Sequence, residues 1–328
     1  MNDFASIYGH ENIIENIKNA ISRGNVSHAY IISGAKGVGK MTVAKAFAKA
    51  LQCHNFNGDS CGKCISCKTF DSGNNPDIFY VYPTKTKSLG VEDIREQIVK
   101  QSDIKQYEHK YKIFIVPDAD KMTEQAQNAL LKTLEEPPKY VVIMLLGEST
   151  DMFIQTVVSR CVNLKLNPLS SEKVKSYLIN NENIDEEKAS FFAEYAQGNI
   201  GRAKELYGSS DFAKKRQDIL DFLNTCFNGK EIDAVLSAKN IEEYKNDSSF
   251  LNIMEIYIRD VLVYKQTKDE RFIIEKDILS RIKSDAKKLS FETIAKRSDA
   301  IYECEKMLKR NVNFSLMTEV LAIRLNEK

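Results

Sequence analysis

A glycine-rich segment at residues 34–41, with the sequence GAKGVGKM, restricts the possible folds of this chain more than any other stretch. It matches the pattern G-x-x-x-x-G-K-[ST] at every fixed position except the last. Glycines allow backbone N–H groups to surround a phosphate, and the N-terminus of a following helix adds a favourable field. The segment therefore predicts a P-loop fold. The positions expected to hold a nucleotide are Gly34, Gly37, Gly39, Lys40, Met41 and Thr42.

Strand and helix patterns alternate around this loop in the first half of the chain. The runs at 113–117 and 141–146 are almost continuously apolar, as in strands of a parallel sheet that is covered on both faces. With these two, the expected strands are 29–33, 78–82, 113–117, 141–146 and 162–166, and the expected helices are 42–52, 91–101 and 124–135. We predict an α/β domain over residues 1–167 with a five-stranded parallel sheet.

The strand pattern stops after Asn167 and Pro168. Residues 168–208 contain two or three short helical patterns, and residues 209–328 remain helical, with apolar stripes such as the one at 314–325. We interpret these stripes as the core of a helical bundle. The prediction is a small helical domain followed by a larger all-α domain.

Charge and hydropathy exclude several classes of protein. The chain has 328 residues with 47 Lys and Arg against 46 Asp and Glu, a net charge of +1. A protein that binds nucleic acid by itself usually has a clear basic excess, so the balance gives no support to a self-standing DNA-binding module. Because no apolar run reaches the roughly 18 residues needed to span a bilayer, and the first residues are polar and amphipathic, we expect a cytoplasmic protein without a membrane partner.

Four of the seven cysteines form a cluster with the spacing Cys53-x₇-Cys61-x₂-Cys64-x₂-Cys67. In a cytoplasmic chain such a cluster argues against disulfides, and its spacing suits tetrahedral Zn²⁺. Since a shell of four thiolates leaves no position for water, we predict a structural zinc module at 53–67. Three alternatives remain open here: His54 as a rival ligand, a loop of reduced thiols, and a redox-active Cys-x-x-Cys pair.

Two substitutions indicate a nucleotide site that does not hydrolyse ATP. Met41 stands where a Ser or Thr hydroxyl would bind Mg²⁺, and a thioether is a poor ligand for that cation. Thr42 is one residue later, about 100° further around the helix. The strand at 113–117 ends in Asp118, a Walker B pattern, but Ala119 follows it and can neither take a proton nor orient a water. Asp120 is a conceivable substitute base. We predict no ATPase activity for the chain alone, and the surviving Lys40 leaves the binding of ATP or ADP open.

Four motifs are similar to those of the bacterial clamp-loader AAA+ subunits. They are SHAY at 27–30, LGVEDIRE at 89–96, NALLKTLEEPP at 128–138 and SRC at 159–161. The resemblance is close over residues 1–166, and the remainder agrees in length and class. It implies a RecA-like AAA+ domain at 1–167, a three-helix lid at 168–208, and a helical collar domain at 209–328 that closes a ring with other subunits.

Within that family, the resemblance favours the delta-prime type of subunit. The tau/gamma type has complete motifs and hydrolyses ATP, whereas the delta-prime type has degraded motifs, as Met41 and Ala119 are here. Glu148 stands near the family's sensor-1 Thr or Asn. Gly201 stands in the slot of its sensor-2 Arg, with Arg202 one place late.

Several partners follow from the resemblance. It implies a non-hydrolysing member of a heteropentamer with delta and three tau/gamma copies, within the DNA polymerase III holoenzyme. Through that complex the chain is expected to help load the sliding clamp on primer-template DNA. Subunits of this type also carry a zinc module at the position of the cysteine cluster.

Arg160 is the residue that the resemblance implies keeps a catalytic role. In the family, the Arg of the SRC motif lies at a subunit boundary and reaches the γ-phosphate bound by the neighbouring subunit. A guanidinium suits this task because it is always charged and presents a planar set of donors. Without the flanking Ser159 and Cys161, an ordinary surface ion pair would be the simpler interpretation of this arginine.

Two other functions compete with this one. An active ATPase resembling tau/gamma is disfavoured by Met41, by Ala119, and by a C-terminus at residue 328 with no polymerase-binding extension. A self-standing DNA-binding module is disfavoured by the charge balance, and a salt-dependent shift of DNA by the chain alone would revive it.

Overall fold

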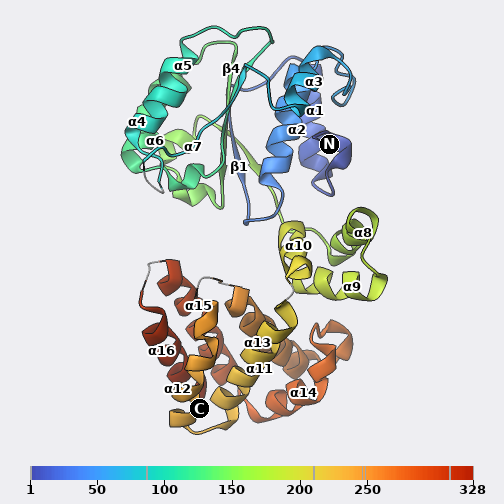
Figure 1. Cartoon of the computed structure of the whole chain (residues 1–328), viewed down its shortest axis with the longest axis vertical. Helices are drawn as coiled ribbons and strands as arrows, with labels where there is room; N and C mark the ends of the chain where they lie inside the picture. The colour runs from blue at the N-terminus through green and yellow to red at the C-terminus, as the bar shows by residue number, and fades with distance from the viewer. Residues whose placement is uncertain are drawn as a thin grey trace. The chain divides into compact units, whose positions relative to one another are not determined.

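The structure is a computed structural model that describes residues 2–85, 88–209, 211–245, 247, 249–309 and 312–327. The chain divides into two compact units, Met1–Lys204 and Glu205–Lys328, which we describe separately. Figure 1 colours both units from blue at the N-terminus to red at the C-terminus.

The first unit contains a sheet of five parallel strands in the order β2-β3-β4-β1-β5. This confirms the predicted fold class. The strands are β1 (Ala29–Ser33), β2 (Ile78–Tyr80), β3 (Lys112–Val116), β4 (Val141–Gly147) and β5 (Val162–Lys165). β2 is two residues shorter than expected. The amide of Val81 still donates to the carbonyl of Ile115. The amide of Tyr82, however, donates to the side-chain oxygen of Gln97, and Pro83 has no N–H to continue the ladder.

Helices cover both faces of this sheet (Figure 1). One face carries α1 (Glu11–Ser22), α2 (Lys40–Gln52) and α3 (Ile65–Asp71). The other carries α4 (Val91–Ile94), a π-helical turn (Arg95–Val99), α5 (Lys100–Ser102), α6 (Glu124–Glu135) and α7 (Gln155–Val158). The segment 91–102 is continuously helical, close to the predicted helix at 91–101.

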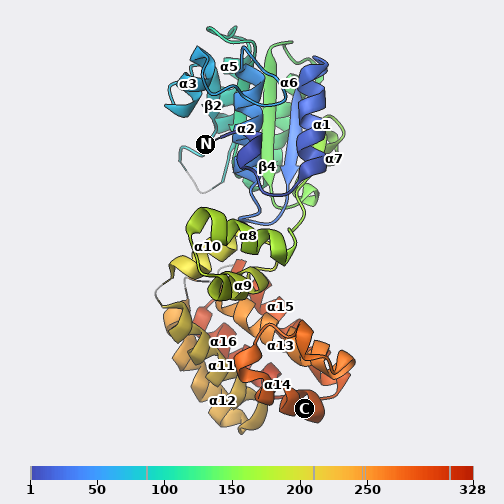
Figure 2. The same cartoon turned by 90° about the vertical axis from the view of Figure 1, so that its right-hand side faces the viewer.

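Two hydrophobic cores fill the space between the sheet and these helices. Because successive side chains of a strand point to opposite faces, Tyr30 and Ile32 of β1 enter the core beneath α2, whereas Ala29 and Ile31 enter the core beneath α6. Alternate residues of β4 divide in the same way. Figure 2 shows α1 and α2 in front of the strands. Burial on both faces explains why β4 and the part of β3 that follows Lys112 are apolar.

Three helices end the first unit: α8 (Ser171–Glu182), α9 (Glu186–Tyr195) and the start of α10 (Ile200–Gly208). They have a small core of their own that includes Val174, Leu178, Ala189 and Ala203. The alanines leave room for α8 and α9 to pack closely. We refer to these helices as the lid.

The second unit is entirely helical in its described residues. Its α-helices are α11 (Phe212–Asn228), α12 (Glu231–Ser237), α13 (Ser249–Thr267), α14 (Leu279–Lys288), α15 (Phe291–Lys309) and α16 (Phe314–Asn326). Helix α13 is largely buried, from Phe250 to Val261. Among the described helices of the chain, none is both long and apolar enough to cross a lipid bilayer.

Candidate nucleotide site and metal centre

The P-loop joins the end of β1 to the start of α2, as predicted. Gly34, Gly37 and Gly39 have φ values of 152°, 84° and 104°, which lie in a region that residues with a Cβ rarely adopt. Gly39 is the N-cap of α2, which begins at Lys40. The sequence pattern therefore corresponds to backbone geometry that requires glycine.

The side chain of Lys40 folds back over the loop. Its Nζ donates to the carbonyls of Gly34 at 2.5 Å and Ala35 at 3.1 Å. Burial lowers the pKa of Lys40, and the nearby carboxylates of Glu148, Asp120 and Asp118 act in the opposite direction. Three carboxylates therefore act electrostatically on the lysine that would bind the phosphates.

Met41 and Thr42 point to different surroundings because one residue along a helix is a rotation of about 100°. Met41 packs against the core beneath α2. Thr42 lines a cavity of about 510 Å³ beside the P-loop, and Met41 is not among the described residues that line it. The position that usually supplies a Mg²⁺ ligand thus serves as core packing here.

The cavity has walls from four parts of the first unit. The P-loop contributes Gly37 to Gly39, and the other lining residues are Ser6, Ile7, Tyr8 and His10 from the N-terminal segment, Thr42 from α2, and Tyr177, Asn181, Ile200, Gly201 and Lys204 from the lid. Its size is typical of small-molecule sites. The sequence motifs identify the P-loop side, Thr42 and Gly201, and they miss the N-terminal wall and the other residues of the lid wall.

Tyr8 and His10 give the N-terminal wall its chemistry. The rings of Tyr8 and Tyr177 meet edge to face, with their centroids 5.0 Å apart. His10 has a φ of 59°, and its Nε2 is buried without a hydrogen-bond partner among the described residues. Burial lowers the pKa of His10 and favours the neutral imidazole. This wall can stack on and hydrogen-bond to a purine base.

The lid contacts the P-loop directly through main-chain groups. The amide of Gly201 donates to the carbonyl of Gly37 at 3.0 Å. The side-chain amide of Asn199 donates to the carbonyl of Lys36 at 2.6 Å. A Cβ at Gly201 would lie 2.7 Å from the Cα of Gly37, so only glycine permits this approach. The residue in the sensor-2 slot therefore acts as a backbone contact.

The residues after β3 are engaged within the unit. Asp118 forms an ion pair with Lys121 at 3.1 Å, and Ala119 is completely buried in the core beneath α6. The carboxylate of Asp120 accepts a hydrogen bond from the amide of Glu148 at 2.8 Å. Asp120 therefore holds the end of β4, although the sequence suggested it as a substitute base.

Arg160 lies just after α7. Its Nη2 pairs with Glu135 of α6 at 2.8 Å, and its Nη1 donates to the carbonyl of Thr156 at 2.9 Å. The Arg160 side chain remains 34% exposed. In the single chain this arginine forms a surface ion pair. Burial raises the pKa of the neighbouring Cys161 to about 12, so that thiol stays protonated at neutral pH.

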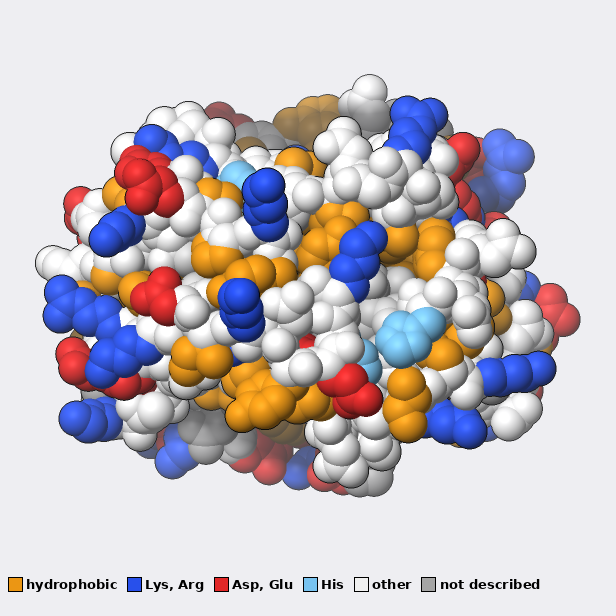
Figure 3. Space-filling view, turned by 90° about the horizontal axis from the view of Figure 1, so that it is seen from above, with side chains coloured by type: hydrophobic (Ala, Val, Ile, Leu, Met, Phe, Trp, Pro, Cys, Tyr) orange, Lys and Arg blue, Asp and Glu red, His pale blue; other side chains and the backbone are white. Residues whose placement is uncertain are grey.

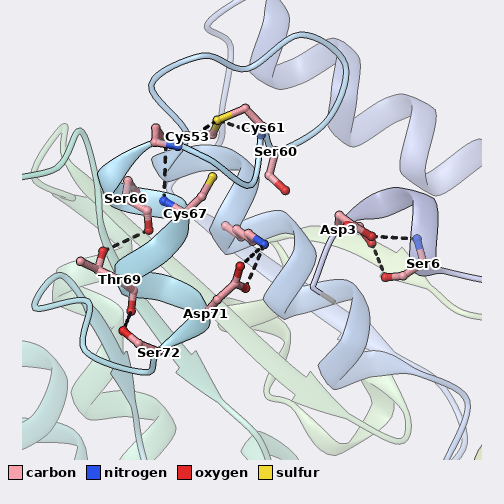
Figure 4. Close-up of polar contacts among 12 residues, drawn as sticks. Asp3, Ser6, Cys53, Ser60, Cys61, Ser66, Cys67, Thr69, Asp71 and Ser72 are labelled. Carbon is pink, nitrogen blue, oxygen red and sulfur yellow. Dashed lines mark hydrogen bonds and ion pairs between the residues drawn. The ribbon is translucent and has the colours of Figure 1, made fainter.

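The four clustered cysteines converge at one point. Cys53 ends α2 and Cys64 is the N-cap of α3, and the ligand atoms of Cys53, Cys61, Cys64 and Cys67 all lie within 4.8 Å of one another. Figure 4 shows three of these cysteines gathered between the end of α2 and α3. Tetrahedral Zn–S bonds of about 2.3 Å place sulfur atoms about 3.8 Å apart, which agrees with this grouping. All seven cysteines lie in described residues and are free thiols.

Backbone amides support the sulfur atoms. The amide of Cys61 donates to the Sγ of Cys53 at 3.2 Å, and the amide of Cys64 donates to the Sγ of Cys61 at 3.4 Å. Hydrogen bonds from the amides of Lys63 and Cys64 lower the pKa of Cys61 to about 6, which favours the thiolate that metals bind. Burial raises the pKa of Cys67. This cluster could hold a metal ion, and His54 is not part of it.

Comparison with known proteins identifies the family. Residues 9–170 match the family model described as DNA polymerase III, delta subunit, and residues 210–327 match the model of the C-terminal part of that subunit. This chain belongs to the delta family of DNA polymerase III subunits.

Its relatives include two types of clamp-loader subunit. The chain is 28% identical to the DNA polymerase III subunit delta' of Bacillus subtilis, over 96% of this chain and 95% of that one. It is 35% identical to a gamma subunit of Buchnera aphidicola, over 62% of this chain and 57% of the relative. A crystal structure of a gamma subunit-related protein of Thermotoga maritima is 18% identical, covers 95% of this chain and 98% of its own, and has a TM-score of 0.42.

Proposed function

We propose that this chain is a delta-prime-like clamp-loader subunit that does not hydrolyse ATP. The observation that carries the proposal is the state of the hydrolytic positions. Met41 packs against the core beneath α2, and Ala119 is buried without a side chain that could act on water. Without the P-loop hydroxyl that binds Mg²⁺ and without a base, the site lacks two of the groups that drive cleavage of a bound triphosphate.

The cavity beside the P-loop is the proposed nucleotide site. Its base side, lined by Tyr8, His10 and Tyr177, offers aromatic rings and an imidazole to a purine. Its phosphate side is less favourable, because Lys40 bonds the loop carbonyls and Glu148, Asp120 and Asp118 lie near. An ADP or ATP molecule held there remains unhydrolysed.

The lid contact supports a rigid role for the first unit. Hydrogen bonds from Gly201 and Asn199 join the lid to the carbonyls of Gly37 and Lys36. The proposed subunit therefore presents a fixed surface to the ring, whereas an ATPase subunit would change its lid position as nucleotide binds and leaves.

Arg160 is the proposed contribution of this chain to catalysis. The guanidinium lies at the surface, where it can exchange Glu135 for the γ-phosphate held by a neighbouring tau/gamma subunit. Both partners offer the oxygen atoms that a planar guanidinium binds. An arginine supplied across a subunit boundary contributes roughly 10³–10⁵ in rate.

The proposed assembly contains delta and tau/gamma subunits, and it acts on the sliding clamp and primed DNA. This chain would reach DNA through that assembly. On the face shown in Figure 3, Lys and Arg side chains lie scattered among acidic and hydrophobic ones. The near-neutral net charge agrees with this distribution.

The cysteine cluster is the proposed site of a structural Zn²⁺. Four thiolates complete a tetrahedral shell, so the metal would stabilise the loop between α2 and α3 and would not activate water. Zn²⁺ would serve folding rather than the chemistry of the ring.

ATP turnover by a reconstituted complex tests this function. The complex of this chain with delta and tau/gamma is compared for the wild type, Lys40→Ala and Arg160→Ala. We expect Lys40→Ala to leave turnover unchanged, because the site of this chain is silent, and Arg160→Ala to slow it. A loss of turnover with Lys40→Ala would mean that this subunit is itself a motor.

A further inference from the structure

We propose that the cysteine loop braces the N-terminal wall of the P-loop cavity through Asp59, so that metal in the cysteine site keeps that wall ordered. The inference rests on the proposed zinc site and gives the cysteine module a role in shaping the proposed nucleotide site. It makes Asp59 a positioning residue.

The brace is a set of hydrogen bonds that joins segments far apart in the sequence. The carboxylate of Asp59 accepts from the amide of Phe4 at 3.1 Å and from the amide of Ala5 at 3.0 Å. It also accepts from the amide of Ser60 at 2.7 Å, which fixes its own orientation. Hydrogen bonds to a charged group are stronger than those between neutral groups. Asp59 therefore anchors the N-terminal segment to the cysteine loop.

The anchored segment leads straight to the cavity. Phe4–Ser6 forms a single 3-10 turn, and such a short turn has little stability of its own. Asp3 caps it by accepting from the amide of Ser6 at 3.0 Å (Figure 4). Ile7, Tyr8 and His10, which follow the turn, line the cavity. Any displacement of the turn would move Tyr8 and His10.

Apolar contacts join the two segments a second time. Phe4 is 3% exposed and lies in the core beneath α2. Phe56 of the cysteine loop packs against the same core. The wall is thus held at one end by Asp59 and Phe4, and at the other by the contact of Tyr8 with Tyr177.

The metal matters because residues 53–64 contain no helix or strand. Gly58 and Gly62 have φ values of 79° and 67°, so the backbone of this loop is intrinsically free. Metal–sulfur bonds would fix both ends of the stretch that carries Asp59, and their removal returns conformational entropy to it. A mobile Asp59 cannot hold Phe4 and Ala5 in place.

Hydrogen–deuterium exchange of the full chain tests the brace without nucleotide. The samples are the Zn²⁺-loaded wild type, the same protein treated with EDTA, and Zn²⁺-loaded Asp59→Ala. We expect amides 4–10 to exchange about tenfold faster in the last two samples. A hydrogen bond to a charged group shifts the local opening equilibrium toward the closed, protected form by at least that factor. The sheet, followed at 112–116, should be unchanged in all three.

Asp71→Asn is the matched control. Asp71 lies in α3, and its carboxylate pairs with Lys49 at 2.7 Å rather than with the N-terminal segment. We expect this variant to exchange at 4–10 like the wild type. If EDTA loosens the cysteine loop but amides 4–10 stay protected, the proposal is overturned. It is also overturned if amides 4–10 of Asp59→Ala exchange at the wild-type rate. A purified chain that binds no Zn²⁺ but protects amides 4–10 would overturn the metal dependence.

A second measurement separates this inference from the nucleotide proposal. Binding of a fluorescent ADP analogue is expected to weaken several-fold in Asp59→Ala and to stay the same in Asp71→Asn. If the wild type binds no analogue while exchange at 4–10 still depends on Asp59, the nucleotide proposal fails and the brace stands. Equal affinity for Asp59→Ala and wild type would show that the brace does not shape the site.

Discussion

The backbone amide of Gly201 donates a hydrogen bond of 3.0 Å to the carbonyl of Gly37, and this bond fixes the lid on the P-loop. The two residues are far apart in the sequence, and both lack the side chain that would keep their backbones apart. A Cβ at Gly37 would lie 2.6 Å from the Oδ1 of Asn199. The pair explains how closely the lid can approach the P-loop.

Gly201→Ala is expected to lower the free energy of unfolding of the first unit by about 1–3 kcal/mol, as for other overpacked sites. The new Cβ would lie 2.7 Å from the Cα of Gly37, so the lid must shift. Urea unfolding measures the change. Gly208→Ala is the control, because a Cβ there meets nothing within 4 Å, and alanine favours a helix by up to about 1 kcal/mol. Equal stability of the two variants would show that the contact is not tight.

Arg160→Ala is expected to slow ATP turnover by the assembled loader without weakening assembly. The loss of turnover should be confined to the ATP site that Arg160 completes, where the rate can fall by a factor of roughly 10³. Stability of the chain alone should change by less than about 1 kcal/mol, since the pair with Glu135 is at the surface.

Glu135→Gln is the matched variant for Arg160. It removes the partner of the guanidinium and leaves the arginine charged, so turnover should remain at or above the wild-type rate. Unchanged turnover of a complete complex with Arg160→Ala would refute the trans role. Loss of turnover in both variants would indicate that the ion pair itself is structural.

Removal of Zn²⁺ is expected to loosen residues 53–70 and to leave the sheet intact. The four thiols hold this loop, whereas β3 and β4 are buried in two cores of described residues to which none of these four cysteines contributes. Limited proteolysis before and after chelation measures the effect, with cleavage near Lys63 expected only after chelation. An identical digestion pattern would argue against a metal in the cluster.

The sheet could be predicted because its strands are buried on both faces. The apolar runs in β3 and β4 predict that these strands are buried. The glycines of the P-loop predict backbone angles that only glycine adopts readily. Both signals lie in the segment that they describe. The end of β2 was less predictable. Tyr82 continues the apolar pattern, but the side chain of Gln97 takes its amide. A hydrogen bond to a side chain 15 residues away leaves no local signal.

The cavity walls were not predictable for a similar reason. Tyr8, His10, Tyr177 and Lys204 are ordinary residues in their own segments, and only the fold brings them beside the P-loop. The substitutions at Met41 and Ala119 could be interpreted, because each falls at a fixed position of a motif. The role of Gly201 could not be predicted. The resemblance indicated only that the sensor-2 arginine is missing at this position, whereas in the structure Gly201 forms a backbone hydrogen bond with Gly37.

The most direct test of a silent nucleotide site is Mg-ATP turnover by the purified chain alone, with Lys40→Ala as the reference. We expect the two proteins to show the same background rate, because Met41 removes the P-loop hydroxyl that binds Mg²⁺ and Ala119 replaces the base. Turnover by the wild type that disappears in Lys40→Ala would contradict this account and make the chain a motor in its own right.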